Sequence, residues 1–143
     1  MNKSFVAIIT VAVSSLAQAQ MTPVGLWRSN DDKTGNAKAE IRITAVSGGA
    51  LSGVIEKALT TGGEPNCDLC TDDRKGKPKV GMEIIRGAKK AEGKDAWEDG
   101  KILDPENGSS YTLRLTPIEG GKKLEVRGSI AFFGRTQIWV RVQ

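Results

Sequence analysis

Short segments in which apolar and polar residues alternate recur along the chain, and they constrain its fold more than any other feature. Two of them place apolar residues at every second position: Tyr111, Leu113 and Leu115, and near the end Ile138, Val140 and Val142. A period of two puts successive side chains on opposite faces, which is typical of antiparallel strands with one buried and one solvated face. All 17 glycines follow residue 24, and many lie between these segments, where tight hairpins need a positive φ.

The alternation predicts about eight strands and no amphipathic helix. The strands are expected near residues 24–29, 38–46, 51–59, 80–90, 95–104, 109–116, 122–130 and 135–142. Asp99-Gly100 predicts a bulge in the fifth strand, and residues 104–108 (Asp-Pro-Glu-Asn-Gly) predict a tight turn with positive φ at Asn107 and Gly108. Consecutive hairpins of this number favour an up-and-down meander that closes into a barrel, because closure removes the exposed strand edges. The predicted fold class is all-β, a single small antiparallel barrel; a sandwich is the alternative.

The first residues are typical of an export signal. A basic start at Lys3 is followed by the apolar run 5–16 and then by Ala17-Gln18-Ala19, the small-x-small pattern of a signal peptidase site. The apolar run is too short to span a bilayer. We therefore expect a cleaved signal peptide over residues 1–19, a barrel domain over residues 20–143, and a periplasmic or secreted protein. No second apolar run follows, so the sequence predicts no transmembrane segment.

The chain contains no histidine, which excludes the most familiar catalytic and metal centres. Without histidine there is no Ser-His-Asp or Cys-His nucleophile system and no common zinc site. The carboxylate pairs lie in predicted turns, where Asp caps the backbone, and none has the spacing of a calcium loop. The formal net charge of +4 comes from scattered residues and aromatic residues are few, which argues against nucleic-acid binding. The sequence thus predicts a non-catalytic protein without metal or cofactor.

Both cysteines, Cys67 and Cys70, lie in the one long irregular segment, residues 60–79. In an oxidising compartment two cysteines most simply form one structural disulfide. A redox role would need a helix N-terminus in a βαβ context, which the surrounding sequence does not predict. We expect a disulfide-pinned surface loop; a lid over the barrel mouth is the alternative.

Gly25-Leu26-Trp27 opens the first predicted strand, and the last one carries Arg135 and Arg141. The glycine permits close approach of chains at a barrel end, the indole would plug the interior, and either arginine would stack on the ring. A tryptophan at the start and an arginine at the end of an eight-strand meander resemble the lipocalins and the wider calycin barrels. The sequence lacks a second lipocalin motif of Thr-Asp-Tyr type and a C-terminal helix.

A closer resemblance extends over residues 23–142 and rests on an ordered set of motifs. These are Pro23-Val24-Gly25-Leu26-Trp27, Asp31-Asp32-Lys33-Thr34-Gly35, Cys67-x-x-Cys70, Gly76-Lys77-Pro78, Gly81, Gly100-Lys101-Ile102-Leu103-Asp104-Pro105-Glu106-Asn107-Gly108, Tyr111, Arg127-Gly128 and Phe133-Gly134-Arg135-Thr136-Gln137-x-Trp139. In this set the chain resembles a bacterial secreted family, domain-of-unknown-function family 2147. The resemblance implies an exported protein with a lipocalin-like barrel and a role in carrying small apolar molecules. It implies no catalytic residues.

An eight-stranded barrel is either filled by side chains or just able to hold one small ligand. As a binding module it would place the ligand against inward-facing residues: Trp27, Ile41, Ile43, Met82, Ile84, Tyr111, Leu113, Val126 and Ile130, with Phe132 near the mouth. Tyr111 would be the polar group that orients an amphipathic ligand. We expect one ring of Phe132-Phe133 to fold over the barrel end; an exposed tip that touches a membrane or a partner is the alternative.

The residues of this inward set would also fill a packed core, so two functional hypotheses follow. The leading one is an exported, non-catalytic protein that binds or carries a small apolar or amphipathic molecule in the barrel. The alternative is an envelope interaction or inhibitor module with a packed barrel, which would act on an unknown protein partner through the 60–79 loop and the Phe132-Phe133 tip.

Overall fold

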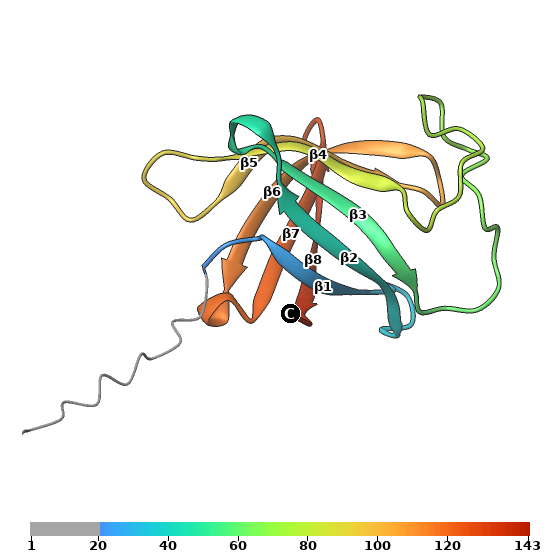
Figure 1. Ribbon diagram of the computed structural model, residues 1–143, viewed down its shortest axis with the longest axis horizontal. Helices are drawn as coiled ribbons and strands as arrows, with labels where there is room; N and C mark the ends of the chain where they lie inside the picture. Colours follow the sequence, from blue (N-terminus) through green and yellow to red (C-terminus); the bar gives the residue numbers. More distant parts are fainter. Residues whose placement is uncertain (1–20) are drawn as a thin grey trace, which may run out of the picture.

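Eight antiparallel strands form a closed barrel in the computed structural model, which describes residues 21–143 (Figure 1). The strands are β1 (Gly25–Asn30), β2 (Ala37–Ala45), β3 (Leu51–Ala58), β4 (Glu83–Lys90), β5 (Trp97–Asp104), β6 (Ser109–Ile118), β7 (Lys123–Ile130) and β8 (Phe133–Arg141). Each strand pairs with the next along the chain, and β8 pairs with β1. The predicted all-β up-and-down barrel is confirmed, whereas the predicted signal peptide lies outside the described residues.

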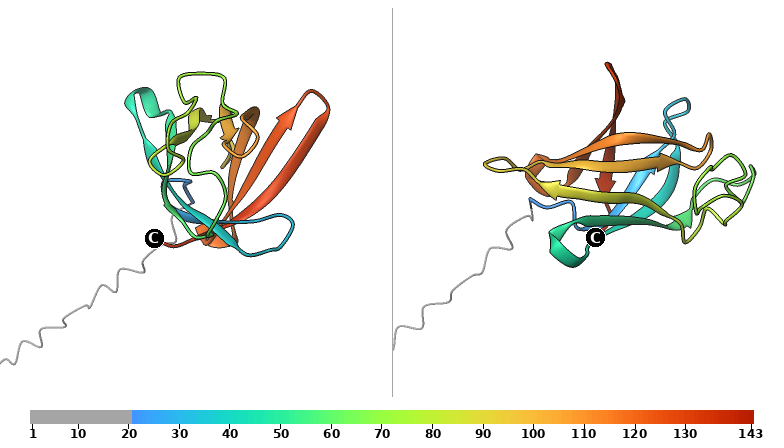
Figure 2. Two further views of the ribbon diagram at one scale, coloured as in Figure 1. Left: turned by 90° about the vertical axis from the view of Figure 1, so that its right-hand side faces the viewer. Right: turned by 90° about the horizontal axis from the view of Figure 1, so that it is seen from above.

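The two ends of the barrel differ. One end, which we call the closed end, carries the 3-10 turns η1 (Ser47–Gly49) and η2 (Glu119–Gly121) and the β4–β5 loop. The other end, which we call the mouth, carries the β1–β2 loop, the long β3–β4 connection, the β5–β6 turn and the β7–β8 turn. The long connection, in green, lies on the right of Figure 1, and the left view of Figure 2 faces this side, where the β7–β8 hairpin projects from the barrel.

Large side chains fill the closed end. The buried residues there are Trp27, Ile43, Leu51, Ala88, Trp97, Leu113, Leu115 and Leu124. The Trp27 indole donates through Nε1 to the carbonyl oxygen of Pro23 (2.7 Å), and the Arg141 guanidinium lies 4.2 Å from the ring centre. The same guanidinium donates hydrogen bonds of 2.6–2.8 Å to three backbone carbonyls, those of Thr22, Val24 and Gly121. Stacking of an arginine on Trp27 is therefore found for Arg141, whereas Arg135 lies at the mouth.

The inward face of β8 is the opposite of the one that its alternation predicted. Trp139 is 2% exposed inside the barrel, whereas Ile138 is 39% exposed on the outer face. The expected buried face of isoleucine and valines was therefore wrong for this strand. An indole buries more apolar surface than the side chain of isoleucine or valine, and the Trp139 Nε1–H donates to Gln137 Oε1 (3.0 Å) inside the barrel.

Two local predictions concern β5 and the turn that follows it. The register between β5 and β6 shifts between Trp97 and Gly100, and Asp99 has a φ of 62°, so the bulge is confirmed. The β5–β6 hairpin is also confirmed, with the Gly108 N–H donating to the carbonyl oxygen of Asp104 (2.8 Å). Of the expected Asn-Gly pair, only Gly108 has a positive φ (73°), because the turn is longer than a two-residue loop.

Residues 60–79, which we call the disulfide loop, pack against the mouth. The Cys67–Cys70 disulfide is present and both residues are buried in the core cluster. The Sγ atom of Cys67 lies 3.3 Å from the carbonyl oxygen of Pro105 in the β5–β6 turn. Gly108 of the same turn approaches Leu69 so closely that a Cβ there would lie 2.0 Å from the Leu69 carbonyl oxygen. The loop is thus pinned by its disulfide, as expected, and it is docked on the barrel rim.

Candidate ligand-binding cavity

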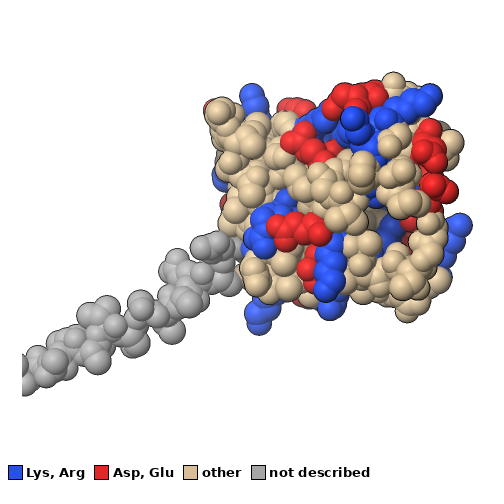
Figure 3. Space-filling view, turned by 45° about the vertical axis from the view of Figure 1, so that its right-hand side comes forward, with Lys and Arg blue, Asp and Glu red and all other residues tan. Residues whose placement is uncertain are grey.

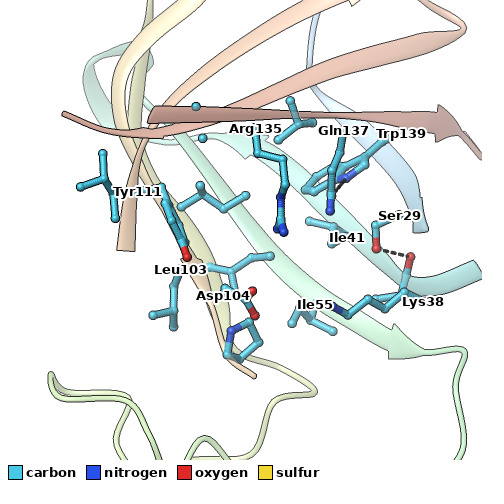
Figure 4. Close-up of a pocket in the computed structure, with 18 of the residues that line it drawn as sticks. Ser29, Lys38, Ile41, Ile55, Leu103, Asp104, Tyr111, Arg135, Gln137 and Trp139 are labelled. Atoms are coloured by element: carbon cyan, nitrogen blue, oxygen red, sulfur yellow. Dashed lines mark hydrogen bonds between the residues drawn. The ribbon is translucent and has the colours of Figure 1, made fainter. Parts of the chain in front are cut away.

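A cavity of about 560 Å³ occupies the mouth half of the barrel. All eight strands contribute to its walls, which are mostly apolar: Ala39, Ile41, Ile55, Ile84, Ile102, Leu103, Pro105, Val126, Ile130, Phe133 and Trp139. Small-molecule sites in proteins typically measure ~300–1,000 Å³ and have mainly apolar walls with a few polar groups. Figure 4 shows the wall from inside, and the space-filling view in Figure 3 shows a hollow with charged side chains around it.

The cavity exists because inward-facing side chains become smaller from the closed end to the mouth. On β1 the inward positions pass from Trp27 to Ser29. On β7 they pass from Leu124 through Val126 to Gly128. Protein interiors are close-packed, so short side chains at matching heights on several strands leave a volume that the closed end does not have. The filled-core and open-barrel interpretations of the sequence therefore each describe one half of the barrel.

Side chains, rather than backbone pairs, join β1 to β8 near the mouth. The two strands pair only near the closed end, at Trp27 with Arg141 and at Arg28 with Val140. Toward the mouth, Asp32 of the β1–β2 loop forms an ion pair with Arg135 (3.1 Å) and accepts a hydrogen bond from the amide Nε2 of Gln137 (2.9 Å). In Figure 4 the Arg135 side chain projects from β8 into the space between Tyr111 and Gln137.

The β1–β2 loop owes its shape to Asp31. The Asp31 Oδ1 atom accepts hydrogen bonds from the backbone N–H groups of Thr34 (2.9 Å) and Lys33 (2.8 Å). These bonds lower the pKa of Asp31 below its ordinary value, because they favour the charged carboxylate. The resulting Asx turn holds the neighbouring Asp32 beside β8.

Further polar groups surround the mouth on the side of the disulfide loop. Lys38 at the start of β2 forms an ion pair with Glu106 of the β5–β6 turn (3.3 Å), and the Tyr111 hydroxyl accepts a hydrogen bond from Nδ2 of Asn107 (3.3 Å). A second hollow of about 500 Å³ lies under the disulfide loop, and it shares Lys38 and three other lining residues with the cavity. The mouth is therefore polar and charged, whereas the interior beneath it is apolar.

Arg74, which is 8% exposed, holds the disulfide loop on β4. Its guanidinium binds the Asp72 carboxylate, with Nε 3.1 Å from Oδ1, and Nη1 donates to the carbonyl oxygen of Glu83 (2.8 Å). The hydrogen bonds from Arg74 lower the pKa of Asp72 to about 2. Beside them Arg86 binds Asp73 (2.9 Å), and this hydrogen bonding lowers the pKa of Asp73 as well. The loop is thus fastened to the wall by charge as well as by its disulfide.

The structure distributes the eight proposed binding residues along the barrel axis. Ile84, Tyr111 and Val126 line the cavity, together with Ile41 and Ile130 of the wider inward set. The other five do not line it: Trp27, Ile43 and Leu113 are packed toward the closed end, Met82 is buried before β4, and Phe132 projects into solvent. We expected one ring of the Phe132-Phe133 pair to fold over the barrel end. Phe132 does not do so: it is fully exposed, because the β7–β8 hairpin projects beyond the rim (Figure 2). The adjacent Phe133 borders the cavity.

Several lining residues were missed by the sequence analysis. The alternation of β8 placed Gln137 and Trp139 on the outer face, Arg135 was considered as a stacking partner of Trp27, and Ile55 and Leu103 were not proposed as binding residues. Arg135, Gln137 and Trp139 are spaced two residues apart, so they lie on one face of a strand. This spacing of a large aromatic residue with two polar ones is the pattern from which an inward, partly polar face could have been predicted.

Neither a metal-binding cluster nor a membrane-spanning helix is found in the part of the chain that the structure describes. Among residues 21–143, no three side chains of the histidine, cysteine, aspartate and glutamate types gather where a metal ion would bind. In the same part of the chain no helix has the length and apolar character needed to cross a membrane.

Comparison with known proteins places this barrel in a family. Residues 25–141 match the model of a family described as an uncharacterized protein conserved in bacteria, DUF2147. Among solved structures the chain is similar to protein HP1028 from the human pathogen Helicobacter pylori, described as belonging to the lipocalin family. That similarity has a TM-score of 0.71 at 14% sequence identity and covers 84% of this chain and 82% of the other. It shows a lipocalin-like fold. No curated protein was found to match the sequence.

Proposed function

This chain belongs to the DUF2147 family, and we propose that it binds one small amphipathic molecule in the mouth half of its barrel. The observation that carries the proposal is the cavity of about 560 Å³, with apolar walls below and polar groups at the rim. The apolar part of the ligand would lie against Ile41, Ile84 and Val126, where its burial supplies the affinity. Its polar part would face the rim.

The polar group of the ligand has defined partners on both sides of the mouth. Tyr111 on β6 presents a hydroxyl at the rim, and Arg135 on β8 projects into the same space (Figure 4). Both cations that line the cavity, Arg135 and Lys38, already pair with carboxylates, so a ligand with an acidic group would compete with Asp32 or Glu106. The site therefore fits a polar, zwitterionic or acidic head group, an acidic one by displacing one of these two carboxylates.

We further propose that the protein is exported and acts as a carrier rather than an enzyme. Residues 1–19 have the pattern of a signal peptide, and a structural disulfide fits an oxidising compartment. The absence of histidine from the sequence supports a non-catalytic role. An interaction module with a packed barrel has less support, because the mouth half of the barrel is unfilled.

A matched pair of tryptophan substitutions tests the binding site. Val126→Trp on β7 puts an indole into the cavity, whereas Ile138→Trp on β8 puts one on the outer face. We expect the wild-type protein and Ile138→Trp to bind a dansyl-labelled undecanoic acid, measured by fluorescence titration, and Val126→Trp to lose that binding while its circular dichroism stays unchanged. Equal affinities of the two variants would contradict a ligand site inside the barrel.

A third variant separates the two halves of the barrel. Ile43 is fully buried and does not line the cavity. Ile43→Trp therefore overpacks a filled region and should lower the free energy of unfolding by about 1–3 kcal/mol or more. Val126→Trp has room for its ring and should be the less destabilised of the two in urea.

A further inference from the structure

Two phenylalanines form the tip of the β7–β8 hairpin at the rim of the cavity. The Phe132 side chain is fully exposed and that of Phe133 is 82% exposed. Ile130 at the end of β7 is half-exposed and continues the same apolar surface. Figure 2 shows the hairpin, in red, projecting beyond the neighbouring strands at the mouth. Exposed aromatic rings gathered at one projecting point are unusual for a surface that only meets water.

The tip residues are also a poor choice for the turn they form. Ile130 pairs with Phe133, so Ala131 and Phe132 are the two turn residues, and Ala131 has a φ of 53°. A two-residue hairpin turn with positive φ normally uses Gly, Asn or Asp, because a Cβ is strained in that region. A polar turn would close the hairpin better and would be better solvated. The strain lies at Ala131, whereas the fully exposed ring of Phe132 makes no contact that the turn needs. Such departures from turn chemistry concentrate at functional sites.

The hairpin behind the tip is basic. No aspartate or glutamate follows Glu125 in the sequence, whereas Arg127 and Arg135 lie on the two strands just behind the rings. Arg127 donates to the Thr136 hydroxyl (3.1 Å) and lies over Gly134, where a Cβ would come within 2.4 Å of its Nη2. Within residues 21–143 no carboxylate forms an ion pair with Arg127. Its charge is held in place and available to an anion.

We propose that the β7–β8 hairpin docks this protein on an anionic phospholipid bilayer. Phe132 and Phe133 enter the boundary between head groups and acyl chains, and Arg127 meets lipid phosphates. A stable protein–protein contact buries ~1,200–2,000 Å², which is far more than two rings on a narrow hairpin offer, whereas an interface between water and lipid needs no complementary pocket. Because Phe133 also borders the cavity, docking brings the mouth to the lipid surface. Docking does not depend on an occupied cavity, so it stands apart from the proposed ligand binding.

Vesicle binding of the purified protein tests the rings. We expect co-sedimentation with phosphatidylcholine vesicles that contain phosphatidylglycerol, and a partition coefficient about tenfold lower for Phe132→Ser, because one ring is no longer buried. Val46→Ser is the matched control, since Val46 is exposed at the closed end, and it should bind as the wild type does. Phe132 does not line the cavity, so Phe132→Ser should keep the affinity for the dansyl-labelled fatty acid. The absence of wild-type binding, or equal binding by Phe132→Ser, would overturn the proposal.

Charge and depth provide two independent readouts. Arg127→Gln should weaken binding to the phosphatidylglycerol vesicles about fivefold, whereas Lys89→Gln, an exposed charge on β4, should not. In Phe132→Trp, vesicle binding should shift the fluorescence of the new indole to the blue, and brominated lipid should quench it. The three native tryptophans are buried and should give a constant background. If the protein is bound to vesicles but the indole of Phe132→Trp still emits at the wavelength of a solvated ring, the insertion of the tip is overturned.

Discussion

Two arginines on the same face of β8 should differ sharply in what they contribute to stability. Arg141 lies over the Trp27 ring at the closed end and donates to three backbone carbonyls. Arg135 lies six positions earlier at the mouth, is 64% exposed, and forms one ion pair with Asp32. Substitution of either residue by methionine keeps an apolar stem of similar length and removes the charge and the donors. The pair therefore compares one change at the two ends of the barrel.

The expected magnitudes follow from these contacts. A hydrogen bond to a charged group contributes about 1.5–3 kcal/mol, and a cation over an aromatic face about 0.5–2 kcal/mol. Because these contributions are not additive and water replaces part of them, we expect Arg141→Met to cost about 3–5 kcal/mol. An exposed ion pair contributes about 0–1 kcal/mol, so Arg135→Met should lower the free energy of unfolding by no more than about 1 kcal/mol. For a domain of this size, the Arg141→Met loss corresponds to a fall in Tm of roughly 10–20 °C.

Urea denaturation followed by tryptophan fluorescence measures both variants, and binding of the dansyl-labelled fatty acid gives a second readout. Arg141→Met should lose stability and, while folded, keep the affinity of the wild type. Arg135→Met should keep stability and change the affinity, because its side chain borders the cavity. Equal losses of stability would refute the larger contribution that we assign to the contacts of Arg141 at the closed end.

Three further changes test contacts that hold the mouth. Gly108→Ala puts a Cβ 2.0 Å from a carbonyl oxygen of the disulfide loop, at a backbone φ of +73°. It should lower the free energy of unfolding by more than about 2 kcal/mol and expose the loop to proteolysis. The control Gly93→Ala has a similar φ but no neighbouring atoms, so it should leave the loop protected. Alanine at both Cys67 and Cys70 should lower the free energy of unfolding by about 2 kcal/mol, the entropic value for so short a loop, and an unchanged urea midpoint would contradict it. Asp72 has a folded pKa of about 2 against an ordinary value of 3.8, so its stabilisation is complete above about pH 4 and is lost as the pH falls toward 2. Asp72→Asn should flatten the fall of stability in that window, and identical pH profiles would refute its role.

The positions of the strands were predictable because their signal is local. Alternation and glycine placement specify where a strand runs and where the chain turns, so the expected segment 109–116 became β6 and the bulge at Asp99-Gly100 was found. The clearest difference is at β4, which begins at Glu83 rather than near residue 80. Gly81 has a φ of 89°, and the residues before Glu83 belong to the connection that carries the disulfide loop.

The cavity was not predictable from the same signal. Alternation defines two faces for β8 but not which one enters the barrel, and the deciding contacts come from far away in the sequence. Gln137 bonds to Asp32, 105 residues earlier, and the Trp139 indole bonds to Gln137. How full the barrel is depends on the summed size of inward residues from all eight strands, which become assignable only once the register is known.

Native mass spectrometry of the protein purified without detergent is the most direct test of a half-open barrel that holds an amphipathic molecule. We predict one equivalent of added mass, released on denaturation as a small amphipathic molecule, or one equivalent of a fatty acid taken up by the bare protein. Val126→Trp should carry no such mass, and Ile138→Trp should carry it. A protein that stays bare with every amphiphile offered, or a Val126→Trp variant that binds as the wild type does, would contradict ligand binding in the cavity.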